Sequence, residues 1–283
     1  ILLSEGMHGM ISQIEGLAKA LDLEFTHHTV ELNNFWKLFP PKLTPISQKT
    51  FKKIDTDDFD VIISCGRKSV IPSIYLKQNS DKKVINIHIQ DPKVNLDNFS
   101  YVIAPEHDGL NGVNVFSTKG AIHYLTKEDI NNHTNYLRDK LETGKEYFSL
   151  ILGGPTKHYD YSDENILNIF SIFNNLVEKN NLQGVIVPSM RTPKNIIELA
   201  KKQLGKKNLV IDTIDKKAYL SALSLAKYIA VTCDSTSMIS EAALTGKPIY
   251  VADIPAKKND FRIKKFHKRF NQLNIIKRLD DKL

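Results

Sequence analysis

Short β-branched runs alternate with amphipathic stretches along almost the whole chain of 283 residues. Several of the runs are continuously apolar, which is typical of parallel strands that are covered on both faces. The stretches between them place apolar residues on one helical face, as Ile166, Ile169, Phe170 and Phe173 do. This alternation predicts βαβ units with right-handed crossovers, and therefore a doubly wound α/β architecture.

The strand-like runs form two series, which indicates two domains. The first series covers 1–4, 25–32, 60–65, 84–90, 101–104 and 113–117, and the second covers 148–152, 184–188, 208–211, 228–232 and 248–252. We predict two Rossmann-like doubly wound domains facing a central cleft, with no strand after Ala252. The expected segments are an N-terminal domain (1–125), a connecting helix or linker (126–146), a C-terminal domain (147–256) and a basic C-terminal helix and tail (257–283).

Composition excludes several classes of protein. Lys and Arg number 39 against 32 Asp and Glu, a net charge of +7, and they are scattered, whereas a nucleic-acid binder concentrates them in a patch. Cys65 and Cys233, expected in separate buried strands, provide neither a disulfide framework nor a Cys-based zinc site. No apolar run reaches the roughly 20 residues that span a bilayer, and the start lacks the basic region of a signal peptide. We expect a cytoplasmic protein without a nucleic-acid partner.

The segment after residue 257 combines basic residues with a stripe of Phe261, Phe266 and Phe270 at helical spacing. We predict a terminal helix that docks on the body of the protein. The alternative is a peripheral helix that contacts a membrane surface through its basic residues.

The loop from Thr232 to Pro248 is the strongest candidate for ligand binding, because open α/β sheets bind ligands at the carboxyl ends of their strands. Asp234 and Ser235 are typical N-cap residues, and the first turn of the following helix is a site for an anion. Glu241 shares a helix face with Ser237, and its carboxylate can accept both hydroxyls of a ribose. The alternative is a well-capped helix with a solvated Glu241.

Two more loops in the second half offer donors to a phosphate. Paired glycines after the first strand let the backbone approach a phosphate closely, although an ordinary tight turn is the alternative and the P-loop pattern is absent. Arg191 follows another strand and suits bidentate capture of an anion. The predicted nucleotide and phosphate site comprises Gly153, Gly154, Thr156, Lys157, Ser189, Arg191, Thr192, Asp234, Ser235, Ser237, Met238 and Glu241.

The loops of the first half carry the titratable groups from which a general base would come. The candidates, unranked, are His8, Asp91, His107 and Asp108, and for each the alternative is a hydrogen-bonding role within its loop. The predicted acceptor side comprises Gly6, Gly9, Gln13, Arg67 and Gln90. Because no H-E-x-x-H pattern exists, we expect no catalytic metal.

Short motifs along nearly the whole chain resemble the mitochondrial-fission "elongated mitochondria" family of plants and its bacterial relatives. They are Gly6, Gly9 and Gln13, Gly66-Arg67, Gln90-Asp91-Pro92, Pro105 to Asp108, Asn114-Val115, Gly120-Ala121, Gly153-Gly154-Pro155, Ser189 to Pro193 and Thr232 to Pro248. Met190 departs from the family, which usually has a second Arg there. This weakens the positive potential of its loop.

That family in turn is similar to the GT-B superfamily, whose enzymes hold a nucleotide on the C-terminal domain. The resemblance implies a glycine-rich loop at 153–156 and a nucleotide-binding helix with Ser235, Ser237 and, on the ribose, Glu241. It also implies an N-terminal domain that supplies the acceptor and the base, with no metal ligands.

The leading hypothesis is a glycosyltransferase-like protein whose substrate is a nucleotide diphosphate-sugar, with no separate cofactor and an unknown acceptor. One alternative is a non-catalytic scaffold that recruits a partner, as the plant relatives are understood to do. Another is a nucleotide-sugar epimerase.

Overall fold

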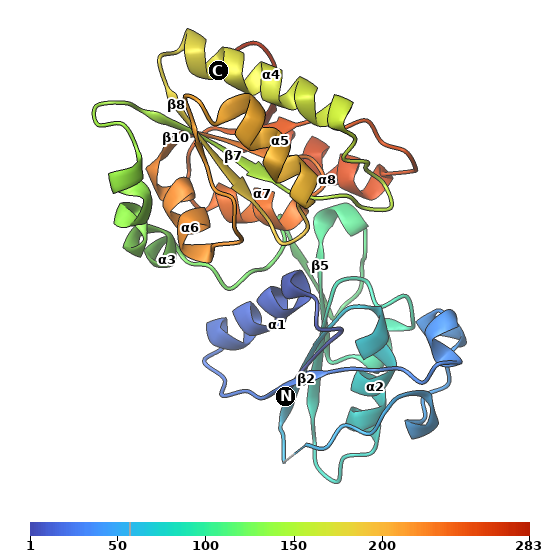
Figure 1. Ribbon diagram of the computed structural model, residues 1–283. Coiled ribbons are helices and arrows are strands. Elements are labelled where there is room, and N and C mark those ends of the chain that lie inside the picture. The colour runs from blue at the N-terminus through green and yellow to red at the C-terminus, as the bar shows by residue number, and fades with distance from the viewer. Residues whose placement is uncertain (57) are drawn as a thin grey trace. The chain divides into compact units, whose positions relative to one another are not determined.

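The structure, a computed structural model, describes residues 1–56 and 58–283. It divides into two compact units, Ile1–Tyr124 and Leu125–Leu283. Each unit contains one six-stranded sheet flanked by helices (Figure 1). All the strand pairs recorded in the two sheets are parallel. The fold is therefore α/β with two Rossmann-like domains.

The first sheet has the strand order β2-β1-β3-β4-β5-β6. Its strands are β1 (Leu2–Ser4), β2 (His27–Thr29), β3 (Val61–Cys65), β4 (Ile85–Ile89), β5 (Tyr101–Pro105) and β6 (Val115–Thr118). The helices are α1 (His8–Ala20) and α2 (Val70–Gln78), with 3-10 turns η1 (Trp36–Leu38), η2 (Pro41–Leu43), η3 (Gln48–Thr50), η4 (Arg67–Ser69), η5 (Leu96–Asn98) and η6 (Glu106–Asp108).

Successive residues of the first sheet lie in different hydrophobic clusters. Leu2 and Ile63 pack with Ile14 of α1, whereas their neighbours Leu3 and Ile62 belong to a separate buried cluster. Alternate side chains of a strand point to opposite faces, so both faces of this sheet are covered. This explains why strands such as β5 are continuously apolar in sequence.

The second sheet has the strand order β12-β11-β10-β7-β8-β9. Its strands are β7 (Tyr147–Leu152), β8 (Gln183–Pro188), β9 (Leu209–Val210), β10 (Ala226–Thr232), β11 (Ile249–Ala252) and β12 (Ile276–Arg278). The helical segments are α3 (Lys127–Asn132), η7 (Thr134–Lys140), α4 (Asp163–Lys179), α5 (Lys194–Leu204), α6 (Lys216–Leu225), α7 (Thr236–Ala243) and α8 (Phe261–Gln272). The strand order reverses between β7 and β10, which brings the loops that follow these strands together at their carboxyl ends.

The eleven predicted strands are confirmed within a few residues, but the expectation of no strand after Ala252 is wrong. Ile276 pairs in parallel with Ile249 of β11. Only Ile276 of the three β12 residues is buried, while Lys277 and Arg278 are exposed, so this edge strand has little hydrophobic signal. The segment 257–283 therefore holds a helix and a strand.

The stretch 126–146, expected to be a connecting helix or linker, contains the short helix α3, which ends at Asn132, and a 3-10 turn after it. The predicted helix start at Thr126 is confirmed by a capping box with Asp129. Cys233 is buried as expected but lies in a turn directly after β10 rather than in the strand.

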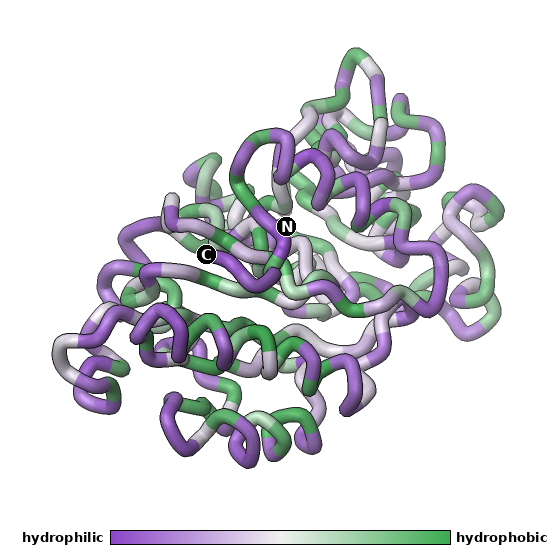
Figure 2. The backbone as a smooth tube through the Cα atoms, turned by 90° about the horizontal axis from the view of Figure 1, so that it is seen from above, coloured by the Kyte–Doolittle hydropathy of each residue, from purple (hydrophilic) through white to green (hydrophobic). Residues whose placement is uncertain are grey.

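Helix α8 packs against its own domain through two aromatic side chains. Phe266 and Phe270 are buried and their ring centroids lie 4.2 Å apart, whereas Phe261 remains exposed. Hydrophilic and hydrophobic residues alternate along the helices in Figure 2, as expected for surface helices with one buried face. Within 1–56 and 58–283, no helix is long and apolar enough to cross a bilayer.

Candidate functional site

The loops after β7, β8 and β10 meet around the carboxylate of Asp234, whose side chain is 0% exposed. Oδ1 accepts hydrogen bonds from the hydroxyls of Tyr161 at 2.5 Å and Thr232 at 2.8 Å. Oδ2 accepts from the Gly154 amide at 3.2 Å and from Nη2 of Arg191 at 2.7 Å. A buried carboxylate is stable only when such donors compensate for lost hydration. Asp234 therefore organises this end of the sheet.

The paired glycines are required because there is no room for a side chain at either position. A Cβ atom on Gly153 would lie 2.3 Å from Oδ2 of Asp234, and one on Gly154 would lie 2.0 Å from the carbonyl oxygen of Arg191. The Gly153 amide donates to Oγ1 of Thr232 at 2.8 Å. The two amides that we expected to face a phosphate are thus bonded within the loop cluster.

The rest of the glycine-rich loop forms a local turn. Oγ1 of Thr156 accepts from the amides of His158 and Tyr159 at 3.1 and 3.2 Å. Lys157 is exposed. Thr156 and Lys157 are both predicted to contact a phosphate, and of the two it is Lys157 whose side chain is exposed to an anion in solution.

The loop after β8 holds Arg191 over this cluster. Oγ1 of Thr192 lies 2.6 Å from the carbonyl oxygen of Gly153 and ties the two loops together, and Oγ of Ser189 accepts from the Arg191 amide at 3.4 Å. Nη1 of Arg191 donates to the Gly154 carbonyl at 3.2 Å. A guanidinium has five N–H donors, and the Arg191 side chain is 40% exposed, so it can also bind an anion from solution.

Helix α7 begins with the predicted cap. Oγ of Ser235 accepts from the Met238 amide at 3.3 Å. The amides of Thr236 and Ser237 lie in the first turn, where helices leave donors without intrahelical acceptors and carry a positive partial charge. The side chains of Ser237 and Met238 are half-buried. This helix start retains the donors of an anion site.

Glu241 lies further along α7 and is held against α6. Its Oε2 accepts from the Tyr219 hydroxyl at 2.7 Å. Burial raises the pKa of Glu241, an effect opposed by the Tyr219 hydrogen bond and the charge of Lys216. Glu241 is half-buried, and it sits on the same helix as the cap that follows Asp234.

A cavity of about 390 Å³ lies beside this cluster, and Cys233 is among its lining residues, with Tyr159, Asp253, Asp260 and His267. The Tyr159 hydroxyl donates to Asp260 at 2.8 Å. Burial raises the pKa of the Cys233 thiol to about 12, and a neutral thiol is a poor nucleophile. Burial therefore disfavours the nucleophilic thiolate of Cys233 at this cavity.

Two of the four base candidates lie against each other in the first domain. Nε2 of His107 is 3.7 Å from Oδ1 of Asp108, and their side chains are 4% and 5% exposed. Asp91 is engaged locally, since it accepts from Nζ and the amide of Lys93 at 2.5 and 2.9 Å. His8 begins α1, and its ring meets that of Tyr124 edge-on at 6.4 Å.

Part of the predicted acceptor side gathers around Gln13. Its Nε2 donates to the carbonyl of Gly9 at 3.1 Å, and its Oε1 accepts from Nε2 of Gln90 at 3.4 Å. Gly6, with φ of +80°, donates its amide to Oγ of Ser4 at 3.1 Å.

Arg67 has a different local role. Its guanidinium donates to the carbonyl of Lys37 at 2.8 Å and to that of Phe39 at 3.4 Å. Arg67 therefore holds the segment before η2 in place.

Three residues of the site are missing from the sequence-based prediction: Tyr161, Thr232 and Tyr219. Tyr161 and Tyr219 contact acidic residues that are 73 and 22 positions away in the chain, and no local pattern reports such contacts. Thr232 is the exception, because a hydroxyl two residues before Asp234 at a strand end is a visible signal.

No group of three or more His, Cys, Asp or Glu residues that could hold a metal ion occurs in the part of the chain that the structure describes.

Comparison with known proteins shows two kinds of likeness. An uncharacterised protein of Rickettsia prowazekii is 25% identical, covering 88% of this chain and 82% of that protein. The mitochondrial fission protein ELM1 of Arabidopsis thaliana is 23% identical over 82% of this chain, which spans only 59% of the plant protein.

Solved structures share the fold at low identity. UDP-N-acetylglucosamine 2-epimerase from Rickettsia bellii has a TM-score of 0.51 at 14% identity, covering 97% of this chain and 95% of that one. The corresponding epimerase from Methanocaldococcus jannaschii has a TM-score of 0.50 at 16% identity, covering 95% and 90%. These likenesses assign the fold to the GT-B-like class. The sequence profile described as mitochondrial fission ELM1 matches residues 8–283, and the chain therefore belongs to that family.

Proposed function

We propose that the carboxyl-terminal domain binds a nucleotide diphosphate-sugar and that the protein transfers the sugar to an acceptor. The observation that carries the proposal is the convergence of three loops and the α7 helix start around Asp234, with Glu241 on the same helix. Ligands of open α/β sheets bind at this position, where the strand order reverses.

The diphosphate would be held by Arg191 and by the first turn of α7. Arg191 is already oriented by Asp234, at 2.7 Å, so less side-chain freedom is lost on binding. The negative charge of Asp234 is compensated by four donors. Asp234 is therefore a positioning residue, and Arg191 is the residue that contacts the phosphate.

The ribose would be bound by Glu241. A carboxylate offers about four acceptor positions, of which the Tyr219 hydroxyl uses one on Oε2. Tyr219 orients the carboxylate, and the remaining positions can accept both ribose hydroxyls.

In the transfer itself, the bond between the sugar C1 and the diphosphate oxygen breaks, and its electron pair stays on that oxygen. The acceptor oxygen forms the new bond to C1 and gives its proton to a base. Arg191 and the α7 dipole would stabilise the departing diphosphate, a large contribution in reactions of this type. The base candidates are those of the amino-terminal domain, His8, Asp91, His107 and Asp108.

A non-catalytic recruiting role is the second candidate, and one observation favours it. The amides of Gly153 and Gly154 donate hydrogen bonds to Thr232 and Asp234. The hydrogen-bonding capacity of these two amides is therefore satisfied without a phosphate. In a recruiting protein, this cluster would only stabilise the fold.

Isothermal titration calorimetry of the full chain with UDP, dTDP, GDP and ADP tests the proposal. We expect binding of at least one of them, weakened by about 1–3 kcal/mol in Glu241→Gln, the usual effect of losing a charged hydrogen-bond partner. The matched control is Glu198→Gln on α5, whose side chain is 72% exposed. Absence of binding to all four nucleotides would refute the proposal and favour the recruiting role.

Proton exchange separates transfer from epimerisation. An epimerase would introduce solvent deuterium into the sugar of a bound nucleotide sugar without an acceptor, whereas a transferase would leave the sugar protons unchanged. Exchange in deuterium oxide, followed by NMR, would therefore replace the transferase assignment with that of an epimerase.

A further inference from the structure

One segment of the amino-terminal domain exposes large apolar side chains in close succession. Between residues 33 and 46, Phe35 is 61% exposed, Leu38 81%, Leu43 64% and Ile46 40%. Single exposed apolar residues are normal on a protein surface, but a contiguous group marks an interaction site. We call residues 33–46 the apolar loop.

Specific contacts hold the apolar loop in a defined conformation. The rings of Phe35, Trp36 and Phe39 pack on one another with centroids 5.0 to 5.6 Å apart. The guanidinium of Arg67 donates hydrogen bonds to the backbone carbonyls of Lys37 and Phe39. The loop is therefore held in a shape that leaves Leu38 facing solvent.

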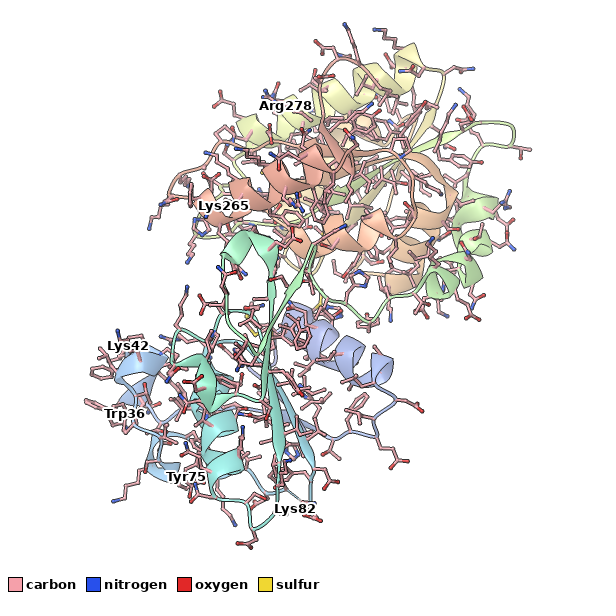
Figure 3. The ribbon with its side chains drawn as sticks, turned by 180° about the vertical axis from the view of Figure 1, so that it is seen from behind. Trp36, Lys42, Tyr75, Lys82, Lys265 and Arg278 are labelled. Carbon is pink, nitrogen blue, oxygen red and sulfur yellow. The ribbon has the colours of Figure 1, made fainter. Side chains whose placement is uncertain are left out.

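Within the apolar loop, and onward to residue 54, the charged side chains are all basic. From residue 32 to residue 54 the sequence contains no Asp or Glu. Lys37, Lys42 and Lys49 are exposed, and none of them is in an ion pair among the described residues. Figure 3 shows Trp36 and Lys42 together on one flank of this domain.

This combination fits the surface of an anionic bilayer. Leucine and phenylalanine side chains enter the boundary between headgroups and acyl chains, tryptophan prefers that boundary, and lysines attract anionic headgroups. A second copy of the chain fits less well, because a two-fold contact would bring Lys37, Lys42 and Lys49 against the same lysines.

We propose that the apolar loop docks the protein on a bilayer that contains anionic lipids. The docking does not depend on nucleotide binding, because all its residues belong to the amino-terminal domain. It also differs from docking through the basic helix α8, whose Phe266 and Phe270 are buried in the other domain.

Trp36 is the only tryptophan of the chain and reports the docking directly. The full chain is titrated with phosphatidylcholine vesicles that contain phosphatidylglycerol or lack it. We expect a blue shift of the Trp36 emission and its quenching by brominated acyl chains only with phosphatidylglycerol, and a reduced shift at high salt. Binding without any change in Trp36 emission would overturn the proposal.

Matched variants locate the contact by co-sedimentation with the same vesicles. Leu38→Ser/Leu43→Ser is expected to lower the partition coefficient about tenfold or more, since both exposed side chains would lose their apolar contact. The control Leu21→Ser/Val113→Ser changes two exposed aliphatic side chains of the same domain and is expected to bind normally.

Charge-reversal variants distinguish binding through the lysines near the apolar loop from binding through the lysines of helix α8. Lys42→Glu/Lys49→Glu is expected to reduce binding by roughly tenfold or more, and Lys265→Glu/Lys268→Glu on α8 to leave it unchanged. Loss of binding in the α8 variant alone would overturn the proposal. So would a dimer in sedimentation velocity that Leu38→Ser/Leu43→Ser abolishes, because it would assign the apolar loop to a second copy.

Discussion

Nη2 of Arg191 lies 2.7 Å from Oδ2 of Asp234, and this ion pair joins the loop after β8 to the loop after β10. The aspartate is fully buried, whereas the arginine side chain is 40% exposed. The buried aspartate therefore has a structural role, while the arginine presents its positive charge at the surface.

Replacement of Asp234 should destabilise the carboxyl-terminal domain strongly. Asp234→Ala leaves the donors of Tyr161, Thr232, Gly154 and Arg191 without their acceptor. The expected loss is about 3–5 kcal/mol in the free energy of unfolding, as for other buried pairs that lose one partner. Urea denaturation measures it. A loss below about 1 kcal/mol, the range of surface pairs, would show that the network contributes little.

Added side chains on the glycine-rich loop should also be costly. In Gly153→Ala the new Cβ would lie 2.3 Å from Oδ2 of Asp234, so the loop must move. The control is Gly144→Ala, where no atom lies within 4 Å but φ is +83°, and the expected cost is about 1 kcal/mol. Thermal unfolding should rank Gly153→Ala well below Gly144→Ala. Equal melting temperatures would contradict this packing.

Much of the fold was predictable because periodicity is a local signal. Strands β7 and β10 are predominantly apolar, and the helix start at Ser235 has a recognisable cap. Strand β12 escaped prediction because one buried residue, Ile276, carries no periodicity.

The hydrogen-bond partners of the site residues are harder to predict from the sequence. Arg191 and Asp234 could be placed at one sheet edge because each follows a strand of the same predicted parallel sheet. The use of the Gly154 amide by Asp234, and the contact of Tyr219 with Glu241, depend on how separate elements pack. Such long-range contacts leave no spacing pattern, so the free donors of the site could not be distinguished from the occupied ones.

Glu241→Gln should stabilise the folded protein while weakening nucleotide binding. Burial raises the pKa of Glu241 above its value in the unfolded chain, so its stabilising contribution is present below the unfolded pKa and is lost as pH rises through the folded pKa. At neutral pH the neutral amide should therefore give a higher melting temperature. It can still accept from the Tyr219 hydroxyl. A lower melting temperature at pH 7 would contradict the burial of this carboxylate.

Acid should destabilise the amino-terminal domain through His88. Its Nδ1 lies 2.9 Å from Oγ of Ser64, and burial lowers its pKa to about 3. Since the unfolded pKa is about 6.5, the unfolded chain binds more protons between the two values. Stability should fall by about 1.4 kcal/mol per unit as pH drops through this window.

His88→Asn isolates this contribution, because the variant lacks the titrating group whatever its stability at pH 7. Urea denaturation from pH 7 to pH 4 should show a slope that is shallower by about 1.4 kcal/mol per pH unit. Parallel curves for the two proteins would mean that His88 is protonated in the fold.

The central claim is that the cluster of Arg191, Asp234 and the start of α7 binds a diphosphate next to Glu241. A crystal structure of the full chain with UDP, or with whichever diphosphate binds best, tests it most directly. We expect diphosphate oxygens about 3 Å from the Arg191 guanidinium and the Thr236 and Ser237 amides, with the ribose hydroxyls on Glu241. A nucleotide bound elsewhere, or none at saturating concentration, would contradict it.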